Sequence, residues 1–165
     1  MTTDTAERVA DIGQPPWENV SNFNPYTFVF RGVECASIEG LLQSTKCKDP
    51  EVQLKIVKLH GIKAKRKGQK KKWWLTKTLY WLGQPMHRHS DEYQSFISDA
   101  YHELYHQNSL FREALKKTGE LKLVHTVGKT DPNFTILTEL EFVTILNTLR
   151  KTITLHSEKM HENSK

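Results

Sequence analysis

The stretch VSNFNPYTFVFRGVECASIEGLLQSTK, residues 20–46, decides the fold. Its first half alternates through Phe28 and Phe30 and then reaches Arg31-Gly32, which predicts a short strand closed by a turn. The segment SIEGLLQSTKC that follows has apolar residues at helical spacing, which predicts a helix. The stretch therefore predicts a small β element joined directly to a helix.

Three polar side chains of this helix are predicted to share one face. Glu39, Gln43 and Lys46 stand at positions i, i+4 and i+7, which lie within about 60° of each other around a helix. One interpretation is an exposed ion pair, which contributes only about 0–1 kcal/mol. The rest of the helix is apolar or small, and we therefore expect the polar stripe to face a lined pocket.

The remaining sequence predicts four further helices and one or two further strands. Asp49-Pro50, Ser90 and Ser109 are helix-start signals, and Thr138 with Glu141 has the spacing of a capping box. KTLYWLGQP and LKLVHTVG are typical of short strands. We expect a mainly α (α+β) domain with a small β element over residues 17–155, preceded by a flexible arm (1–16) and followed by a polar, frayed tail (156–165).

Composition restricts the class of protein. The chain has 165 residues, of which 37% are hydrophobic and 26% charged, as in one soluble globular domain. No apolar run approaches the roughly 20 residues of a membrane span, and the first residues lack a secretory signal. Cys35 and Cys47 have no C-x-x-C partner and are expected to be reduced thiols. We expect a cytoplasmic protein without a membrane partner and without a cofactor.

A dense basic run, KAKRKGQKKK, occupies residues 63–72 in a chain of net charge +5. One interpretation is a solvated face or loop. The other is a phosphate-binding footprint for a dinucleotide or a nucleic acid, because like charges at this density repel unless an anion neutralises them. Trp74 follows the run, and an aromatic platform beside cations suits a stacked base.

The order of several short motifs resembles a known family. Ser21-Asn22-Phe23, the Gly32 turn and the helix with Glu39, Gln43 and Lys46 resemble the N-terminal half of the NADAR superfamily of YbiA-like proteins. AKRKG (64–68), SLFREALKKTG (109–119) and ILNTLR (145–150) are similar to later motifs of that family. The resemblance covers about residues 17–154 and implies a single YbiA-like helical domain.

The resemblance also implies an activity. Family members are N-glycosidases that cleave the C1–N bond of ribose in ribosylamino-pyrimidine phosphates or in ADP-ribose compounds, including ADP-ribosyl-guanine in DNA. Such cleavage passes through an oxocarbenium-like state that a carboxylate stabilises, and we assign this role to Glu39. Lys46 is the second catalytic candidate, either as a proton donor or orienting group, or as an amine that forms an imine with the opened ribose.

Further residues are expected to bind the substrate. Asn22 and Gln43 can hold hydroxyl groups, and Phe23 can stack on a base. The complete set of predicted substrate-binding residues is Asn22, Phe23, Gln43, Arg66, Trp74, His125, Lys129, Asp131, Glu139 and Arg150. Two departures from the family affect the leaving group: the loop HTVGKTDPNFTILTELEF replaces a Trp-Gly-x-Gly pattern, and Gly40 replaces a histidine.

Two other classes of function are open. A non-catalytic module that binds ADP-ribose or nucleic acid would keep the same fold and basic run. HELYH (102–106) matches the H-E-x-x-H signature of zinc metallopeptidases, with its histidines one helical turn apart. His106 lies at the end of its predicted helix and no third ligand follows in the expected pattern. We therefore expect an accidental match and no metal site.

Overall fold

The computed structural model describes residues 8–164, apart from the side chains at positions 154, 156 and 157. Its α-helices are α1 Ile38–Ser44, α2 Pro50–Ile56, α3 Gly61–Gln69, α4 Asp91–Gln107, α5 Ser109–Lys117 and α6 Glu139–Glu162. Its strands are β1 Val9–Asp11, β2 Phe28–Phe30, β3 Val33–Cys35, β4 Thr78–Trp81, β5 Gln84–His87 and β6 Lys122–Val124. Short 3-10 turns occur at Glu18–Val20 and Trp73–Leu75.

Three separate two-stranded sheets accompany the helices within residues 8–164, which confirms the predicted mainly helical α+β fold with a small β element. β2 pairs with β3 and β4 with β5 as antiparallel hairpins, whereas β1 and β6 are parallel. The predicted turn at Arg31-Gly32 is confirmed: both residues have positive φ, 48° and 80°. This is the turn geometry that matches the twist of a tight hairpin.

Side-chain caps start most of the predicted helices. Asp49 caps α2, Ser90 caps α4, and the capping box of Thr138 and Glu141 starts α6, as the sequence predicts. The predicted cap at Ser109 is wrong by one residue. The Asn108 side chain accepts from the backbone N–H of Phe111 instead, because α4 ends at Gln107 and frees Asn108.

α3 is the helix that the sequence pattern does not predict, and it carries most of the basic run. Its apolar signal is restricted to small residues: Ala64 is fully buried, and Gly68 is buried beside Gln43. A methyl group on Gly68 would overlap the Gln43 side-chain oxygen. Small residues therefore let α3 pack closely against α1, and they give almost no hydrophobic periodicity to detect.

The predicted flexible arm over residues 1–16 is wrong from Val9 onward. β1 pairs in parallel with β6, and Ile12 donates its backbone N–H to the Val124 oxygen at 2.8 Å. Ala10 and Ile12 are fully buried. A short polar segment gains order here from pairing with a strand more than one hundred residues away, which local pattern cannot reveal; positions 1–7 lie outside the described residues.

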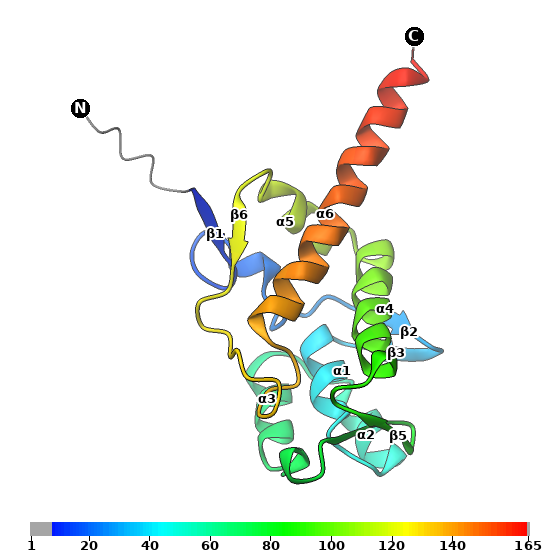
Figure 1. Ribbon diagram of the computed structural model, residues 1–165. Coiled ribbons are helices and arrows are strands. Elements are labelled where there is room, and N and C mark those ends of the chain that lie inside the picture. Colours follow the sequence, from blue (N-terminus) through cyan, green and yellow to red (C-terminus); the bar gives the residue numbers. More distant parts are fainter. Residues whose placement is uncertain (1–7, 165) are drawn as a thin grey trace, which may run out of the picture.

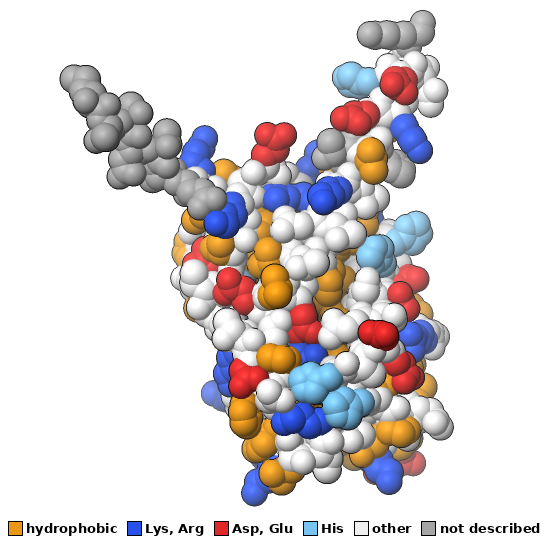
Figure 2. All heavy atoms as spheres, in the orientation of Figure 1, with side chains coloured by type: hydrophobic (Ala, Val, Ile, Leu, Met, Phe, Trp, Pro, Cys, Tyr) orange, Lys and Arg blue, Asp and Glu red, His pale blue; other side chains and the backbone are white. Residues whose placement is uncertain are grey.

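The predicted frayed tail is also corrected, because α6 continues through position 156 to Glu162. No glycine or proline interrupts this segment of sequence. Figure 1 shows the C-terminal end of α6 projecting beyond the rest of the molecule. In Figure 2 this projecting end carries side chains of both charges, which suits a solvated helix surface.

The core is built around α1, which packs against α2, α3 and α4. All seven residues of α1 are buried, including Glu39 and Gln43. On the α4 side, Phe30, Trp81 and Phe96 form an aromatic cluster with ring centroids 5.1–5.6 Å apart. No helix in the described part of the chain is both long enough and apolar enough to cross a membrane.

Candidate active site

A cavity of about 440 Å³ opens beside α1, within the size range of small-ligand sites. Four parts of the chain enclose it: residues 13–23, α1, α3, and the segment from His125 to Phe142. The last part runs past α3 and α1 before α6 begins (Figure 1). The cavity therefore depends on tertiary packing of distant segments.

Glu39 and Gln43 form the buried floor of the cavity, with exposed fractions of 8% and 7%. Gln43 Nε2 donates to Glu39 Oε1 at 2.8 Å, so the amide orients the carboxylate. The side-chain oxygen of Gln43, Oε1, is buried and has no hydrogen-bond partner among the described atoms. Lys46, two residues beyond the end of α1, lines the same cavity. The three residues of the predicted polar face, Glu39, Gln43 and Lys46, therefore all line one cavity.

The environment shifts the protonation of both catalytic candidates. Burial raises the pKa of the Glu39 carboxyl above 4.5, while the Gln43 hydrogen bond and nearby Lys46 and Lys65 oppose that rise. Burial lowers the pKa of the Lys46 amine from 10.5 to about 8; Glu39 opposes this shift, and Lys129 and Lys65 add to it. An acid and a base with pKa values displaced toward each other are typical of catalytic sites.

Tyr101 contacts a residue of the cavity wall, Asn22, and the sequence analysis did not identify it. It lies on α4, is fully buried, and its hydroxyl donates to Asn22 Oδ1 at 2.7 Å. Because the oxygen of Asn22 accepts this bond, its NH₂ group is the part left to donate to a ligand. Burial raises the pKa of Tyr101 well above its usual value; the hydrogen bond to Asn22 opposes this rise, and the negative charge of Glu39 adds to it. Helical spacing alone assigned Tyr101 to the apolar stripe of α4.

Aromatic and cationic side chains form the walls and rim. Phe23, Phe134 and Phe142 line the cavity. Lys65 of α3 also lines it and holds its Nζ 5.8 Å from the centre of the Phe23 ring. Lys129 lines the cavity from the 125–142 segment. Apolar faces with nearby cations suit a ligand that combines a flat ring with negative charge.

Seven of the twelve predicted site residues line the cavity: Asn22, Phe23, Glu39, Gln43, Lys46, His125 and Lys129. The other five do not. Arg66 lines a separate shallow hollow with Lys63, Lys67 and Lys70. Trp74 packs against the core.

Three of these five have local structural contacts instead. Asp131 accepts the backbone N–H of Asn133 at 2.9 Å. Glu139 is the first residue of α6, and its N–H donates to Lys129 O. Arg150 donates to the Leu121 oxygen at 2.6 Å. The sequence predicts Asp131 and Glu139 near the site because they lie on or beside one loop, and Arg150 because its charge suits a phosphate.

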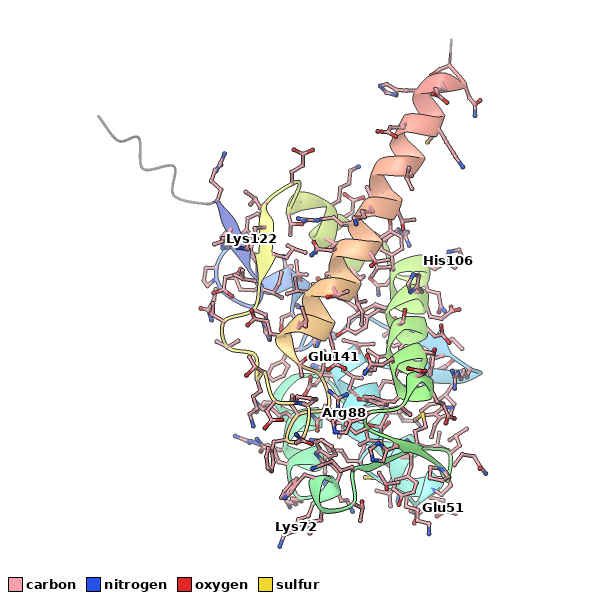
Figure 3. All side chains as sticks on the ribbon, viewed as in Figure 1. Glu51, Lys72, Arg88, His106, Lys122 and Glu141 are labelled. Carbon is pink, nitrogen blue, oxygen red and sulfur yellow. The ribbon has the colours of Figure 1, made fainter. Side chains whose placement is uncertain are left out.

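A buried ion pair fixes the wall of the cavity. Arg88, only 1% exposed, donates to both oxygens of Glu141 at 2.5 and 3.1 Å and through Nε to the Thr135 oxygen at 2.9 Å. Figure 3 shows Arg88 and Glu141 side by side where α6 begins. Burial raises the Glu141 pKa, but hydrogen bonds from Arg88, Thr138 and Gln94 outweigh it, and the net pKa lies below 4.5. Arg88 thereby holds residues 135–138, which line the cavity.

His102, Glu103 and His106 of the HELYH segment are exposed on α4 and do not line the cavity. His102 contacts the Ser98 oxygen through Nδ1, and Glu103 accepts a hydrogen bond from Gln107. His106 is exposed at the end of α4 (Figure 3). Among the described residues, no three His, Cys, Asp or Glu side chains are grouped to hold a metal ion.

Comparisons with known proteins give both a family and a fold. The family model described as "Bacteriophage protein GP30.3" matches residues 16–151. The "Uncharacterized 17.1 kDa protein in Gp30-rIII intergenic region" of Enterobacteria phage T4 is 37% identical over 137 residues, which cover 81% of this chain and 90% of that protein.

The chain also resembles a solved structure, the NMR structure of the E. coli protein YbiA, with a TM-score of 0.59 over 93% of this chain and 92% of YbiA. This likeness confirms the predicted YbiA-like fold, and at 16% identity it extends to the fold alone. The family model and the phage T4 relative each span most of the chain, and the protein therefore belongs to the bacteriophage GP30.3 family.

Proposed function

We propose that this protein is an N-glycosidase that hydrolyses the bond between C1 of a ribose and a nitrogen in a phosphate-bearing substrate. ADP-ribose compounds, among them ADP-ribosyl-guanine in DNA, and ribosylamino-pyrimidine phosphates are the substrate types that the NADAR resemblance implies. The observation that carries the proposal is the presence of buried Glu39 and partly buried Lys46 in one cavity that is also lined by aromatic rings.

Glu39 is the group that meets the positive charge developing at C1. As the C1–N bond breaks, its electron pair leaves with the nitrogen and C1 gains oxocarbenium character. An ionised carboxylate in a buried site stabilises that cation more strongly than it would in water. Glu39 then accepts a proton from the attacking water, whose oxygen forms the new bond to C1. Gln43 keeps the carboxylate in place through its 2.8 Å hydrogen bond.

Lys46 supplies the second half of the reaction. With a pKa of about 8, its side chain is mostly an ammonium at pH 7 and is a stronger acid than an exposed lysine. It can therefore donate a proton to the departing nitrogen, after which the proton on Glu39 returns to Lys46 through solvent. The sum is one water added across one C1–N bond, with both side chains restored.

The covalent version of this mechanism uses Lys46 as a neutral amine. The amine adds to C1 as the ribose ring opens, the base leaves with a proton, and water hydrolyses the resulting imine. Borohydride added during turnover reduces such an imine to a stable secondary amine on Lys46. A ribosyl adduct found at Lys46 by peptide mass spectrometry selects the covalent route, and its absence with full turnover selects direct water attack.

A binding module without catalysis is the second candidate, and the outer side of α3 favours it. Lys63, Arg66, Lys67 and Lys70 line a shallow hollow of about 260 Å³ together with Leu59. These cations face away from the main cavity, as a groove for a nucleic-acid backbone would. In this alternative the cavity holds ADP-ribose or a nucleotide without cleaving it.

One experiment separates the two candidates. The purified protein is incubated with a panel of ribosylated compounds, both free and attached to DNA, and released bases are identified by mass spectrometry. Binding of each compound is measured in parallel by calorimetry. Release of a base from one compound class supports the N-glycosidase. Tight binding of ADP-ribose or DNA with no base released from any compound supports the binding module and contradicts the enzyme.

A further inference from the structure

The polar side chains that line the cavity differ in solvent exposure, which increases from the floor to the rim. Glu39 and Gln43 at the floor are more than nine-tenths buried, and Lys46 is partly buried. Lys65 and Lys129 also line the cavity but are exposed. The carboxylate of Glu39 is thus shielded from solvent, whereas the amines of Lys65 and Lys129 are solvent-exposed.

Lys65 is separated from the rest of the basic run by the geometry of α3. Ala64 and Gly68 turn one side of the helix toward α1. Next to that side, Lys65 and Gln69 line the main cavity, whereas the neighbouring cations of α3 line the separate outer hollow. The position of Lys65 Nζ, 5.8 Å from the Phe23 ring centre, holds its charge at the rim. Lys65 therefore belongs to the cavity.

Lys129 reaches the cavity from a separate segment. Its backbone oxygen accepts from the N–H of Glu139 at 2.9 Å, which ties it to the start of α6. The preceding turn is tight: Gly128 lies against the His125 ring, where a side chain would not fit, and His125 Nδ1 contacts the Ile12 oxygen at 2.9 Å. The backbone that presents Lys129 is therefore anchored on two sides.

The charges around the cavity are not balanced within the described residues. Glu39 is the one carboxylate among the lining side chains, against Lys46, Lys65 and Lys129. The ion pairs found in the described part of the chain, Arg31 with Asp99 and Arg88 with Glu141, involve none of these lysines. Lys65 and Lys129 line the same cavity as Lys46, and both lower the Lys46 pKa through their positive charge. Three amines that line one cavity with a single carboxylate favour the binding of an anion there.

We propose that Lys65 and Lys129 form a phosphate subsite at the rim of the cavity, one amine from each side. A ribose phosphate ester then enters sugar first, with C1 toward Glu39 and its phosphate held between the two lysines. This inference rests on the proposed function for the direction of the sugar, but the subsite itself needs no catalysis. It predicts that ribosides with a phosphate on the sugar are selected over ribosides without one, whether the phosphate belongs to a free nucleotide or to a nucleic-acid end.

The probes for this subsite are ribose 5-phosphate and ribose, neither of which carries a leaving base. Affinities are measured by calorimetry at low and at high salt for the wild-type protein, Lys65→Gln, Lys129→Gln and the double variant. Lys55→Gln, an exposed lysine at the end of α2, is the matched control for loss of one charge. Thermal melts of each variant establish that it is folded.

We expect wild-type protein to bind ribose 5-phosphate well above ribose, and to lose affinity with added salt. Each single variant should bind the phosphate ester about tenfold more weakly, as expected for a charge-assisted hydrogen bond, and Lys55→Gln should bind as wild type does. Equal binding of the ester and of ribose by wild-type protein overturns the subsite. So does a folded double variant with wild-type affinity, or a control that is weakened as much.

These outcomes are separate from those of the proposed function. A subsite that passes this test in a protein that releases no base from any ribosylated compound supports the subsite and contradicts the N-glycosidase. Base release by a double variant with wild-type affinity for the ester and wild-type Michaelis constants supports the enzyme and overturns the subsite. A panel that adds a 5′-phosphorylated oligonucleotide to the free ester tells which phosphate source the rim accepts.

Discussion

At the scale of residues, the candidate site rests on three polar side chains on one side of α1 and just beyond its end: Glu39, Gln43 and Lys46. Their i, i+4, i+7 pattern predicts one polar face, and all three line the cavity. Tyr101 could not be found in this way, because its spacing on α4 is that of a core residue. Its role depends on Asn22, 79 positions away in the chain, whose side chain its hydroxyl contacts. A buried tyrosine hydroxyl needs a polar partner, but the sequence does not say which one.

The pH dependence of turnover tests the role of Lys46. Its ammonium form predominates below the pKa of about 8 and is lost above it. If Lys46 donates a proton to the leaving nitrogen, kcat/KM falls as pH rises through about 8. Lys46→Arg should move this decline to higher pH, since guanidinium stays protonated. A rate that instead increases through pH 8 contradicts the proton-donor role and favours the neutral amine.

Tyr101→Phe tests whether Tyr101 positions Asn22. Loss of the hydroxyl lets the Asn22 amide rotate, and we expect kcat/KM to fall by about tenfold, with a stability loss of about 1 kcal/mol. Tyr26→Phe is the matched control, since that hydroxyl donates to the Asn19 oxygen outside the cavity. A double-mutant cycle with Asn22→Ala measures the coupling. If Tyr101→Phe lowers kcat/KM equally with and without Asn22, Tyr101 does not act through Asn22.

At the scale of elements, the sequence predicted the helix starts and the hairpin turn that local residue patterns determine. Capping signals at Ser90 and Thr138 were confirmed, and so was the hairpin turn at Arg31-Gly32. α3 was missed because its contacts use Ala64 and Gly68, which carry little hydrophobic signal. β1 was missed because its order comes from β6. Helix ends and tight turns are local properties, whereas these two elements exist through long-range contacts.

Arg88→Met tests how the wall of the cavity is held. It leaves Glu141 without its cation and releases the Thr135 oxygen, and we expect a loss of about 3–5 kcal/mol in unfolding free energy at pH 7. Asp99→Asn, which breaks the exposed pair with Arg31, should cost no more than about 1 kcal/mol. Urea denaturation measures both. Equal, small losses in the two variants would contradict a structural role for the Arg88 pair.

The pH dependence of the unfolding free energy of Arg88→Met gives a further test of the ion pair. The Glu141 pKa is lowered in the folded state, so its contribution is present above pH 4.5 and is lost as pH falls through the folded pKa. Arg88→Met lacks most of that contribution already. Its stability should therefore decline less between neutral and acid pH than that of the wild-type protein.

At the scale of the whole molecule, the site is a product of the fold. Residues 13–23, α1, α3 and the 125–142 segment meet only through tertiary packing. The sequence could identify candidates on each segment but not which of them converge. Arg66 and Arg150, which lie in family-like segments and carry charge suited to a phosphate, do not line the cavity, while Lys65 is one of seven cations in its run and does line it. A residue with suitable chemistry belongs to the site only where the fold brings its segment to the cavity.

Turnover by Glu39→Gln tests the central claim most directly. Glutamine keeps the size of the side chain and a hydrogen-bonding oxygen but removes the charge needed as C1 becomes positive. With the substrate found in the panel, we expect kcat to fall by about 10²–10³-fold or more, with the Michaelis constant nearly unchanged. Glu51→Gln, at an exposed position on α2 (Figure 3), is the matched control and should keep wild-type turnover.

The melting temperature is measured on the same preparations. The account predicts a folded Glu39→Gln protein that binds substrate and does not turn it over. A Glu39→Gln protein with a lowered melting temperature and near-normal turnover per folded molecule would contradict the account, because Glu39 would then support the fold and not the reaction.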